Sequence, residues 1–216
     1  MNKIYLIAIS ALFVLAGCAP AQPEATGSAT CEYPSDGQAA RPVTAPATTG
    51  VESSGTATAT LMLNDQPVAL TLDRAKAPCT VNSFLSLAKQ GFYDGVACHR
   101  LSDSGGLFML QCGDPSGTGS GGPGYRFADE LTGTETYPAG TVAMANTGQP
   151  VSNGSQFFLV YADTQLPAAY TVFATMDAAG IAAIEAIAAG GHDSSYGAVG
   201  GGRPNSPAVI TSVNLG

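Results

Sequence analysis

Short runs in which apolar and small polar residues alternate recur from residue 56 to the end of the chain. This period of two is typical of half-buried strands. The predicted strands are residues 56–63, 68–72, 92–101, 108–114, 140–145, 155–160, 170–174 and 209–215. Residues 77–90 and 178–189 have the spacing of helices. Because the helices do not alternate with strands, we predict a mainly β fold, a closed eight-stranded antiparallel β-barrel capped by two α-helices.

One predicted hairpin, with its turn at residues 102–106, carries an unexpected cation. The chain has only eight Lys and Arg in total, yet Arg100 lies in the first strand of this hairpin. The second strand begins with Phe108 and contains Gln111. A guanidinium beside a Phe and a Gln predicts a small apolar pocket with one strong hydrogen-bond donor. Such a pocket suits an uncharged ligand with a carbonyl group, for example a peptide.

The N-terminus has the pattern of a cleaved export signal. Lys3 precedes the apolar residues 4–16, a run too short to span a bilayer but suited to a signal-peptide core. The run ends in Leu15-Ala-Gly-Cys18, which resembles the bacterial lipobox. We therefore expect residues 1–17 to be a lipoprotein signal peptide. Lipidated Cys18 would hold the protein at the extracytoplasmic face of the cell membrane. The alternative is an ordinary signal peptide with a chance cysteine.

Residues 18–55 are rich in Ala, Pro, Thr, Ser and Gly and contain few large apolar residues. Such a segment cannot bury enough surface to offset its ordering entropy, so we predict a lipidated tether. Its one unusual feature is Cys31-Glu-Tyr-Pro34. Residues 56–216 contain enough apolar residues for one domain, which we expect to be a monomer.

Charge and residue spacing exclude several classes of partner. Sixteen acidic residues face eight basic ones, and no Lys/Arg cluster is present, which argues against nucleic acid. No Cys/His spacing predicts a zinc site, and Asp114, Asp129 and Glu130 are candidate ligands by charge alone. We expect no metal and no cofactor.

Four cysteines remain beside Cys18, and in an exported chain they can form disulfides in three pairings. Cys98 and Cys112 lie in the two strands of the predicted hairpin, so they are candidate neighbours. Cys31 and Cys79 would then pin the tether to the domain. The alternative is that all four are buried free thiols.

Six motifs then occur in the order and spacing of the cyclophilin family of peptidyl-prolyl isomerases, and the chain resembles that family over nearly all of residues 56–216. The motifs are Gly91-Phe-Tyr-Asp-Gly95, His99-Arg100, Phe108-Met-x-Gln-x-Gly-Asp114, Met144-Ala-Asn146, Asn153-Gly-Ser-Gln-Phe-Phe158 and Val172-Phe173. The cysteines and the glycine-rich residues 117–125 are similar to the lipoprotein cyclophilins of high-GC Gram-positive bacteria. The resemblance implies an eight-stranded antiparallel barrel with two helices.

The resemblance also implies roles for individual residues. Arg100 matches the catalytic arginine of the family. The matching walls of the proline pocket are Phe108, Met109, Phe158 and Leu166, and the matching residues of the peptide groove are Gln111, Ala145, Asn146 and Gln156. Gln165 stands where eukaryotic members have Trp, and the substrate-binding position Tyr170 stands where they have His. These departures imply reduced sensitivity to cyclosporin.

The implied activity is peptidyl-prolyl cis-trans isomerisation of proline-containing peptides and unfolded exported proteins. An alternative is a cyclophilin-like module that binds peptides or acts as a chaperone with little turnover. A weaker alternative is a structural envelope lipoprotein. Arg100 has an alternative interpretation as the ion-pair partner of Asp94 or Asp114. His99 is expected to point to the other strand face as a core histidine.

Overall fold

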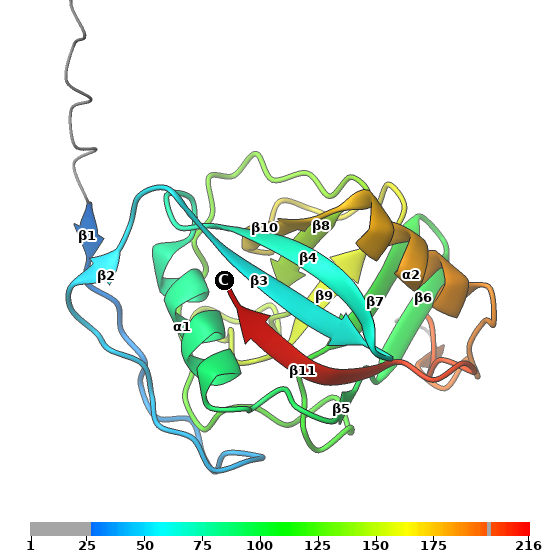
Figure 1. The fold of residues 1–216 in the computed structure, drawn as a ribbon, viewed down its shortest axis with the longest axis horizontal. Helices are drawn as coiled ribbons and strands as arrows, with labels where there is room; N and C mark the ends of the chain where they lie inside the picture. Colours follow the sequence, from blue (N-terminus) through cyan, green and yellow to red (C-terminus); the bar gives the residue numbers. More distant parts are fainter. Residues whose placement is uncertain (1–26, 198–199) are drawn as a thin grey trace, which may run out of the picture.

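The computed structural model describes residues 27–197 and 200–216. Its main element is a nine-stranded sheet with the strand order β5-β11-β3-β4-β10-β8-β9-β7-β6, in which all pairings are antiparallel (Figure 1). The strands are β3 (Thr56–Leu63), β4 (Gln66–Asp73), β5 (Val96–Ala97), β6 (Arg100–Ser104), β7 (Leu107–Cys112), β8 (Thr141–Met144), β9 (Phe157–Val160), β10 (Val172–Met176) and β11 (Val209–Leu215). The predicted mainly β, antiparallel architecture is confirmed.

The sheet curls into a half-barrel and is not fully closed as predicted, because its two edge strands do not pair with each other. β5 and β6 stand at the two ends of the strand order, but Cys98 and His99 alone separate them in sequence. The predicted first hairpin strand is thus split into two parts. β5 pairs with β11 and β6 pairs with β7, which explains why nine strands are observed where eight were expected.

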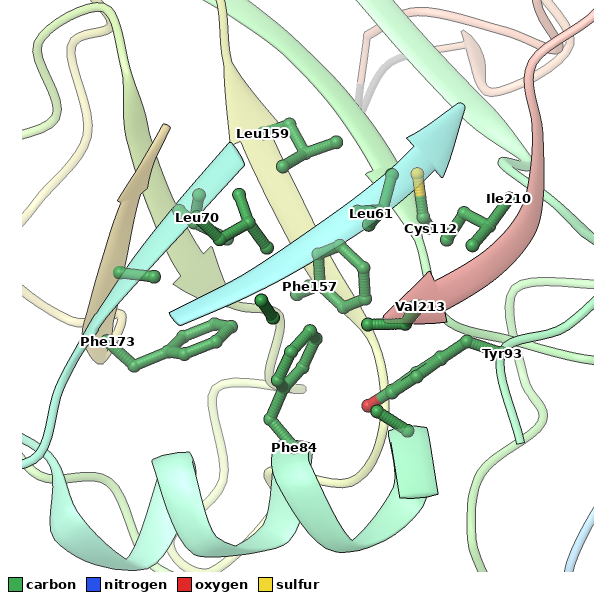
Figure 2. Packing of buried hydrophobic residues seen from close by; sticks show 14 of the residues in the cluster. Leu61, Leu70, Phe84, Tyr93, Cys112, Phe157, Leu159, Phe173, Ile210 and Val213 are labelled. Atoms are coloured by element: carbon green, nitrogen blue, oxygen red, sulfur yellow. The ribbon is translucent and has the colours of Figure 1, made fainter. Parts of the chain in front are cut away.

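The two predicted helices are present, α1 (Pro78–Lys89) and α2 (Ala178–Ala188), and they lie on opposite sides of the curled sheet (Figure 1). Phe84 of α1 points into the barrel, where its ring lies 5.7 Å from that of Phe157 and 5.4 Å from that of Phe173 (Figure 2). These rings are buried together with the inward-facing leucines of β3 and β4. Burial of each such side chain contributes about 1.5–3 kcal/mol, so this cluster is a main source of stability.

The N-terminus of α1 is capped from a distant segment. The preceding residue, Ala77, offers no side-chain acceptor. Instead the carboxylate of Glu130 accepts hydrogen bonds from the backbone N–H groups of Cys79 (2.9 Å) and Thr80 (2.8 Å). A carboxylate at this position satisfies otherwise unpaired N–H groups and interacts favourably with the helix dipole. Glu130 therefore has a structural role at the start of α1.

Residues 27–55, here called the strap, do not form a loose tether. The strap begins with β1 (Ser28–Ala29), ends shortly after its partner strand β2 (Val51–Glu52), and runs along the outer side of α1 (Figure 1). A disulfide joins Cys31 to Cys79. The hydroxyl of Tyr33 donates to the carbonyl of Cys79 at 2.7 Å. The segment expected to be a tether is thus ordered over residues 27–55 and joined to the domain by the Cys31–Cys79 disulfide, so the ordered unit begins well before residue 56.

Composition misled this prediction because the strap attaches mainly through polar groups. Arg41 alone donates to the carbonyls of Gly91 (2.8 Å), Phe92 (3.0 Å) and Asp94 (2.8 Å). Such side-chain contacts to backbone need few apolar residues, so the strap satisfies its polar groups without a core of its own. The expected signal peptide and Cys18 lie outside the described residues. No helix within the described ranges is long and apolar enough to cross a membrane.

Candidate active site

A cavity of about 350 Å³ opens beside the β6–β7 hairpin. Its wall is formed by Arg100, Leu107, Met109, Gln111, Ala145, Asn146, Phe158, Leu166 and Tyr170. Arg100 and Gln111 are direct partners in the register of β6 and β7, which places both at one end of the hairpin. Eight of the residues predicted for catalysis or substrate binding thus lie around one cavity; Phe108 and Gln156 do not line it.

Phe108 faces the other side of its strand. Successive residues of a strand point to opposite faces, so Leu107, Met109 and Gln111 face the cavity while Phe108 turns toward the barrel interior. The Phe108 ring packs edge-on against Tyr161 with 6.1 Å between centroids. The structure therefore places Leu107, which the sequence analysis missed, in the wall position expected for Phe108.

The apolar end of the cavity is held in shape by aromatic contacts. The rings of Phe158 and Tyr170 meet edge-on at 5.6 Å between centroids. Beneath them, the buried Tyr137 accepts a hydrogen bond from the N–H of Tyr170 at 3.0 Å, and its hydroxyl lies 3.1 Å from the carbonyl oxygen of Pro167. These bonds fix the loop that carries Leu166 and Tyr170, so this part of the pocket is formed before any ligand enters.

Contacts with neighbouring groups fix Arg100 at the polar rim. Its Nε donates to the carbonyl of Gly200 at 3.0 Å, and a terminal nitrogen donates to Oε1 of Gln111 at 3.3 Å. The guanidinium also lies over the ring of Tyr196, 5.6 Å from its centroid. Burial lowers the pKa of Arg100, and the nearby Tyr196 and Tyr170 partly oppose this effect. A guanidinium starts from so high a pKa that it stays charged at neutral pH.

A chain of amide hydrogen bonds leads from Arg100 to the glycine-rich loop. Gln111 donates from Nε2 to Oε1 of Gln156 at 2.9 Å. Gln156 in turn donates to the carbonyls of Gly119 and Gly121, both at 3.0 Å. Gln156 therefore lies behind Gln111, outside the cavity wall, and orients it. Gln156 also lines a second, polar groove that adjoins this cavity.

Asn146 also has its side chain engaged within the protein. Its Nδ2 donates to the carbonyl of Ala169 at 2.8 Å and to Asp129 at 3.1 Å, while its Oδ1 accepts from Gly148 at 3.0 Å. The side chain thus ties three loop segments together at the cavity rim.

Asp129, considered above as a metal ligand, accepts hydrogen bonds from Asn146 and Asn153. Nowhere in the described ranges do three or more His, Cys, Asp or Glu side chains gather as a metal site would require.

The glycine-rich loop is organised around the buried carboxylate of Asp114. Its oxygens accept from the N–H groups of Ser116 (2.7 Å), Gly119 (2.7 Å) and Gly121 (3.0 Å), and from the Ser116 hydroxyl (2.6 Å). Burial raises the pKa of Asp114, but these hydrogen bonds together outweigh it and leave the pKa lowered. Asp114, considered above as an ion-pair partner of Arg100, thus holds the loop that supports Gln156.

We expect Asp114→Asn to destabilise the protein at pH 7 by about 1–3 kcal/mol, because an amide accepts fewer hydrogen bonds than a carboxylate. The folded pKa lies below the unfolded value of about 3.9. The contribution of Asp114 is therefore present above that pH and is lost as the pH falls through the folded pKa. Urea unfolding between pH 2 and 7 measures this difference. The exposed-turn variant Asp65→Asn is the matched control, and equal pH dependence of wild type and Asp114→Asn would contradict the prediction.

His99 is buried beside Arg100, in agreement with its interpretation as a core histidine. Burial lowers its pKa, and Asp114 opposes this effect only in part. The imidazole is therefore neutral at physiological pH.

Both predicted disulfides are formed, Cys31–Cys79 and Cys98–Cys112. The second joins the segment between β5 and β6 to the end of β7.

An antiparallel barrel with a small apolar cavity, rimmed by a fixed guanidinium and a glutamine amide, defines a protein that binds a compact apolar group next to a carbonyl. Comparison with known proteins identifies the family. Residues 58–215 match the model of the cyclophilin type peptidyl-prolyl cis-trans isomerase/CLD family. The chain therefore belongs to the cyclophilin-type peptidyl-prolyl cis-trans isomerases, and it is an enzyme of that class.

Named relatives and solved structures agree with this assignment. The chain is 45% identical over 213 residues to the "Probable peptidyl-prolyl cis-trans isomerase B" of Mycobacterium tuberculosis, covering 91% of this chain and 67% of that protein. The corresponding protein of Mycobacterium leprae is 45% identical over 210 residues, with 90% and 69% covered. A crystal structure of a Cryptosporidium parvum cyclophilin superposes with a TM-score of 0.65 at 27% identity, covering 75% of this chain and 98% of that chain. The same protein has been crystallised in the presence of the dipeptide Ala-Pro.

Proposed function

We propose that the cavity holds the proline ring of an X-Pro peptide while Arg100 stabilises the twisted peptide bond. The observation that carries this proposal is the position of Arg100. It lies at the rim of an apolar cavity, fixed by Gly200, Gln111 and Tyr196. A proline ring fits the chemistry of the opposite wall, which contains Met109 and Phe158.

Rotation about an X-Pro bond has a barrier of about 18–20 kcal/mol because conjugation favours the two planar forms. In the twisted transition state the prolyl nitrogen loses conjugation and gains lone-pair character. A donor aimed at that nitrogen, or at the neighbouring carbonyl, stabilises the transition state over both planar states. Arg100 supplies such a donor without losing its proton, and the reaction needs no bond to be made or broken.

The other wall residues bind the proline ring and the peptide backbone. Leu107, Met109, Phe158, Leu166 and Tyr170 hold the ring through apolar contact. Gln111, oriented by Gln156, holds the peptide backbone on one side of the rotating X-Pro bond, and the rim shaped by Asn146 and Ala145 bounds the other side. Two parts of the substrate held in this way can rotate against each other.

The test is an isomerase assay on an Ala-Pro peptide with the wild-type chain and with Arg100→Ala. Acceleration by wild type that is lost in the variant supports the proposal. The second candidate, a peptide-binding or chaperone module with little turnover, predicts saturable peptide binding without acceleration. The pre-formed, fixed position of Arg100 favours the catalytic alternative.

We further propose that the substrates are exported proteins that fold outside the cytoplasm. Both disulfides lie in the ordered unit, and such bonds persist in oxidising compartments and are rare in the cytosol. A prolyl isomerase in that setting would act on X-Pro bonds whose uncatalysed isomerisation takes tens of seconds.

Anchoring through a lipid on Cys18 completes this proposal, and it is supported by the lipobox-like residues 15–18. We expect the wild-type chain, expressed in a bacterium that processes lipoproteins, to partition into the detergent phase of a Triton X-114 extract and to incorporate labelled palmitate. Cys18→Ser should partition into the aqueous phase without label, because the acyl chains supply the membrane affinity. Equal partitioning of the two chains would contradict the anchor.

A further inference from the structure

A second groove, of about 290 Å³, adjoins the proline-sized cavity and shares Gln111, Ala145 and Asn146 with it. Its floor is the glycine-rich loop from Gly119 to Gly124, and polar residues dominate its wall. The outer side of this wall is contributed by the strap, through Asp36 and Gln38. A segment expected to be a tether therefore reaches the edge of the substrate site.

The strap is held at this position by its backbone. The N–H of Asp36 donates to the carbonyl of Gly124 and the N–H of Ala40 to that of Gly122, both at 2.9 Å. The N–H of Arg126 donates back to Pro34 at 3.0 Å. A Cβ atom at Gly124, which has φ +78°, would lie 2.9 Å from the nitrogen of Ala39. Glycine at this position thus permits the close approach, and the strap is fixed against the loop.

Two opposite charges stand at the rim of the groove, one from each side of this contact. Asp36 of the strap and Arg126 of the loop lie 3.6 Å apart, with side chains 56% and 48% exposed. An ion pair this exposed contributes about 0–1 kcal/mol to stability. Both side chains therefore remain accessible to a ligand in the groove, where each charge partly compensates the other.

We propose that Asp36 and Arg126 determine which charged side chains the groove accepts next to the X-Pro pair of a peptide. This inference rests on the proposed isomerase function. Because the two charges balance, the wild-type groove admits basic and acidic side chains alike. Without Asp36 the groove would present Arg126 alone and would select acidic residues. The strap is thereby a specificity-determining part of the substrate site.

The test uses the purified full-length chain in detergent and NMR exchange measurements on Ala-Pro peptides. The peptides carry Lys or Glu at a position two residues before or two residues after the proline. For one of these positions, Asp36→Asn should raise the Glu-to-Lys ratio of exchange rates by about three-fold, and Arg126→Gln should lower it by about three-fold. The double variant should return to the wild-type ratio. Glu32→Gln, which removes an exposed strap charge that does not line the groove, should leave the ratio unchanged.

The outcomes separate this inference from the function on which it rests. If wild type accelerates exchange but neither single variant changes the ratio at either position, the charge-selecting role is overturned. If wild type accelerates no peptide, the isomerase proposal itself fails. The shifts should shrink markedly between 10 mM and about 1 M salt, because exposed charges are then screened over about 3 Å. Ratio changes that are independent of salt would also overturn the inference.

Discussion

Arg100→Ala is expected to lower kcat/KM for an Ala-Pro peptide by about 10²–10³-fold while the protein stays folded. Loss of one pre-organised donor to a developing charge typically has this effect, equivalent to about 2.7–4 kcal/mol of transition-state stabilisation. The donor is pre-organised here because Gly200, Gln111 and Tyr196 fix the guanidinium before substrate binds. A protease-coupled assay, corrected for the uncatalysed rate, measures the change.

Two further variants make this result specific. Arg100→Lys keeps a positive charge but loses the planar fork that bonds Gly200 and Gln111 together, so we expect it to recover only part of the lost rate. Arg74→Ala removes a partly buried arginine that pairs with Glu52 at 2.8 Å and does not line the cavity, so it should change the rate less than two-fold. Equal kcat/KM for wild type and Arg100→Ala, with equal circular dichroism spectra, would exclude Arg100 as the catalytic donor.

The assay also separates chemistry from binding. If Arg100 acts mainly on the transition state, kcat and kcat/KM should fall together with little change in KM. If it mainly binds the ground-state carbonyl, KM should rise instead. Activity should be nearly constant between pH 7 and 9, because Arg100 stays charged there and the buried His99, whose pKa is lowered by burial, stays neutral.

Much of the barrel was predictable because its strands have a clear period of two. In β4 the buried residues are Val68, Leu70 and Leu72, and this alternation is visible in the sequence. The same rule indicates which residues of β7 share a face. Applied strictly, it places Leu107 with Met109 and Gln111, and it excludes Phe108 from the cavity wall. The resemblance to the family motif had assigned Phe108 to the pocket wall. The structure instead agrees with the alternation, because Leu107 lines the cavity and Phe108 packs against Tyr161.

Contacts between distant loops were not predictable. Tyr196 and Gly200 hold Arg100, but they lie in a glycine-rich segment with no periodic pattern and about one hundred residues further along the chain. The capping of α1 by Glu130 is a similar case, since the first turn of the helix contains no acid. Such contacts depend on tertiary arrangement, which local propensity does not encode.

The strap was missed for a related reason, although one residue signalled it. Low hydrophobicity is a good indicator of disorder when a segment has no covalent tie. Cys31 provides such a tie, and Tyr33 beside it is buried against Tyr125 and Phe127 at 5.4 and 5.7 Å between ring centroids. The tetrapeptide at residues 31–34 was thus the sequence signal for an ordered strap.

Replacing both Cys31 and Cys79 by alanine is expected to lower the free energy of unfolding by about 2–4 kcal/mol. The disulfide closes a loop of 48 residues that includes β3 and β4, so it restricts the unfolded chain across two central strands of the sheet. The chain-entropy model gives about 4 kcal/mol for a loop of this length. The Cys98–Cys112 bond spans 14 residues, for which the model gives about 3 kcal/mol.

Urea unfolding of the oxidised wild type and the double-alanine variant measures the difference, and limited proteolysis reports where order is lost. Without the disulfide only hydrogen bonds and packing hold the strap, so cleavage should concentrate within residues 36–50 before the barrel unfolds. Tyr33→Phe is the matched control: it keeps the buried ring, loses the hydrogen bond to Cys79 and the one that Asn82 donates to the hydroxyl, and should cost about 1–2 kcal/mol. An unchanged unfolding midpoint and unchanged protease resistance in the double-alanine variant would mean that the strap is held by its hydrogen bonds alone. Because the strap forms one wall of the second groove, loss of order there should also alter the Glu-to-Lys ratio while activity on an uncharged peptide persists.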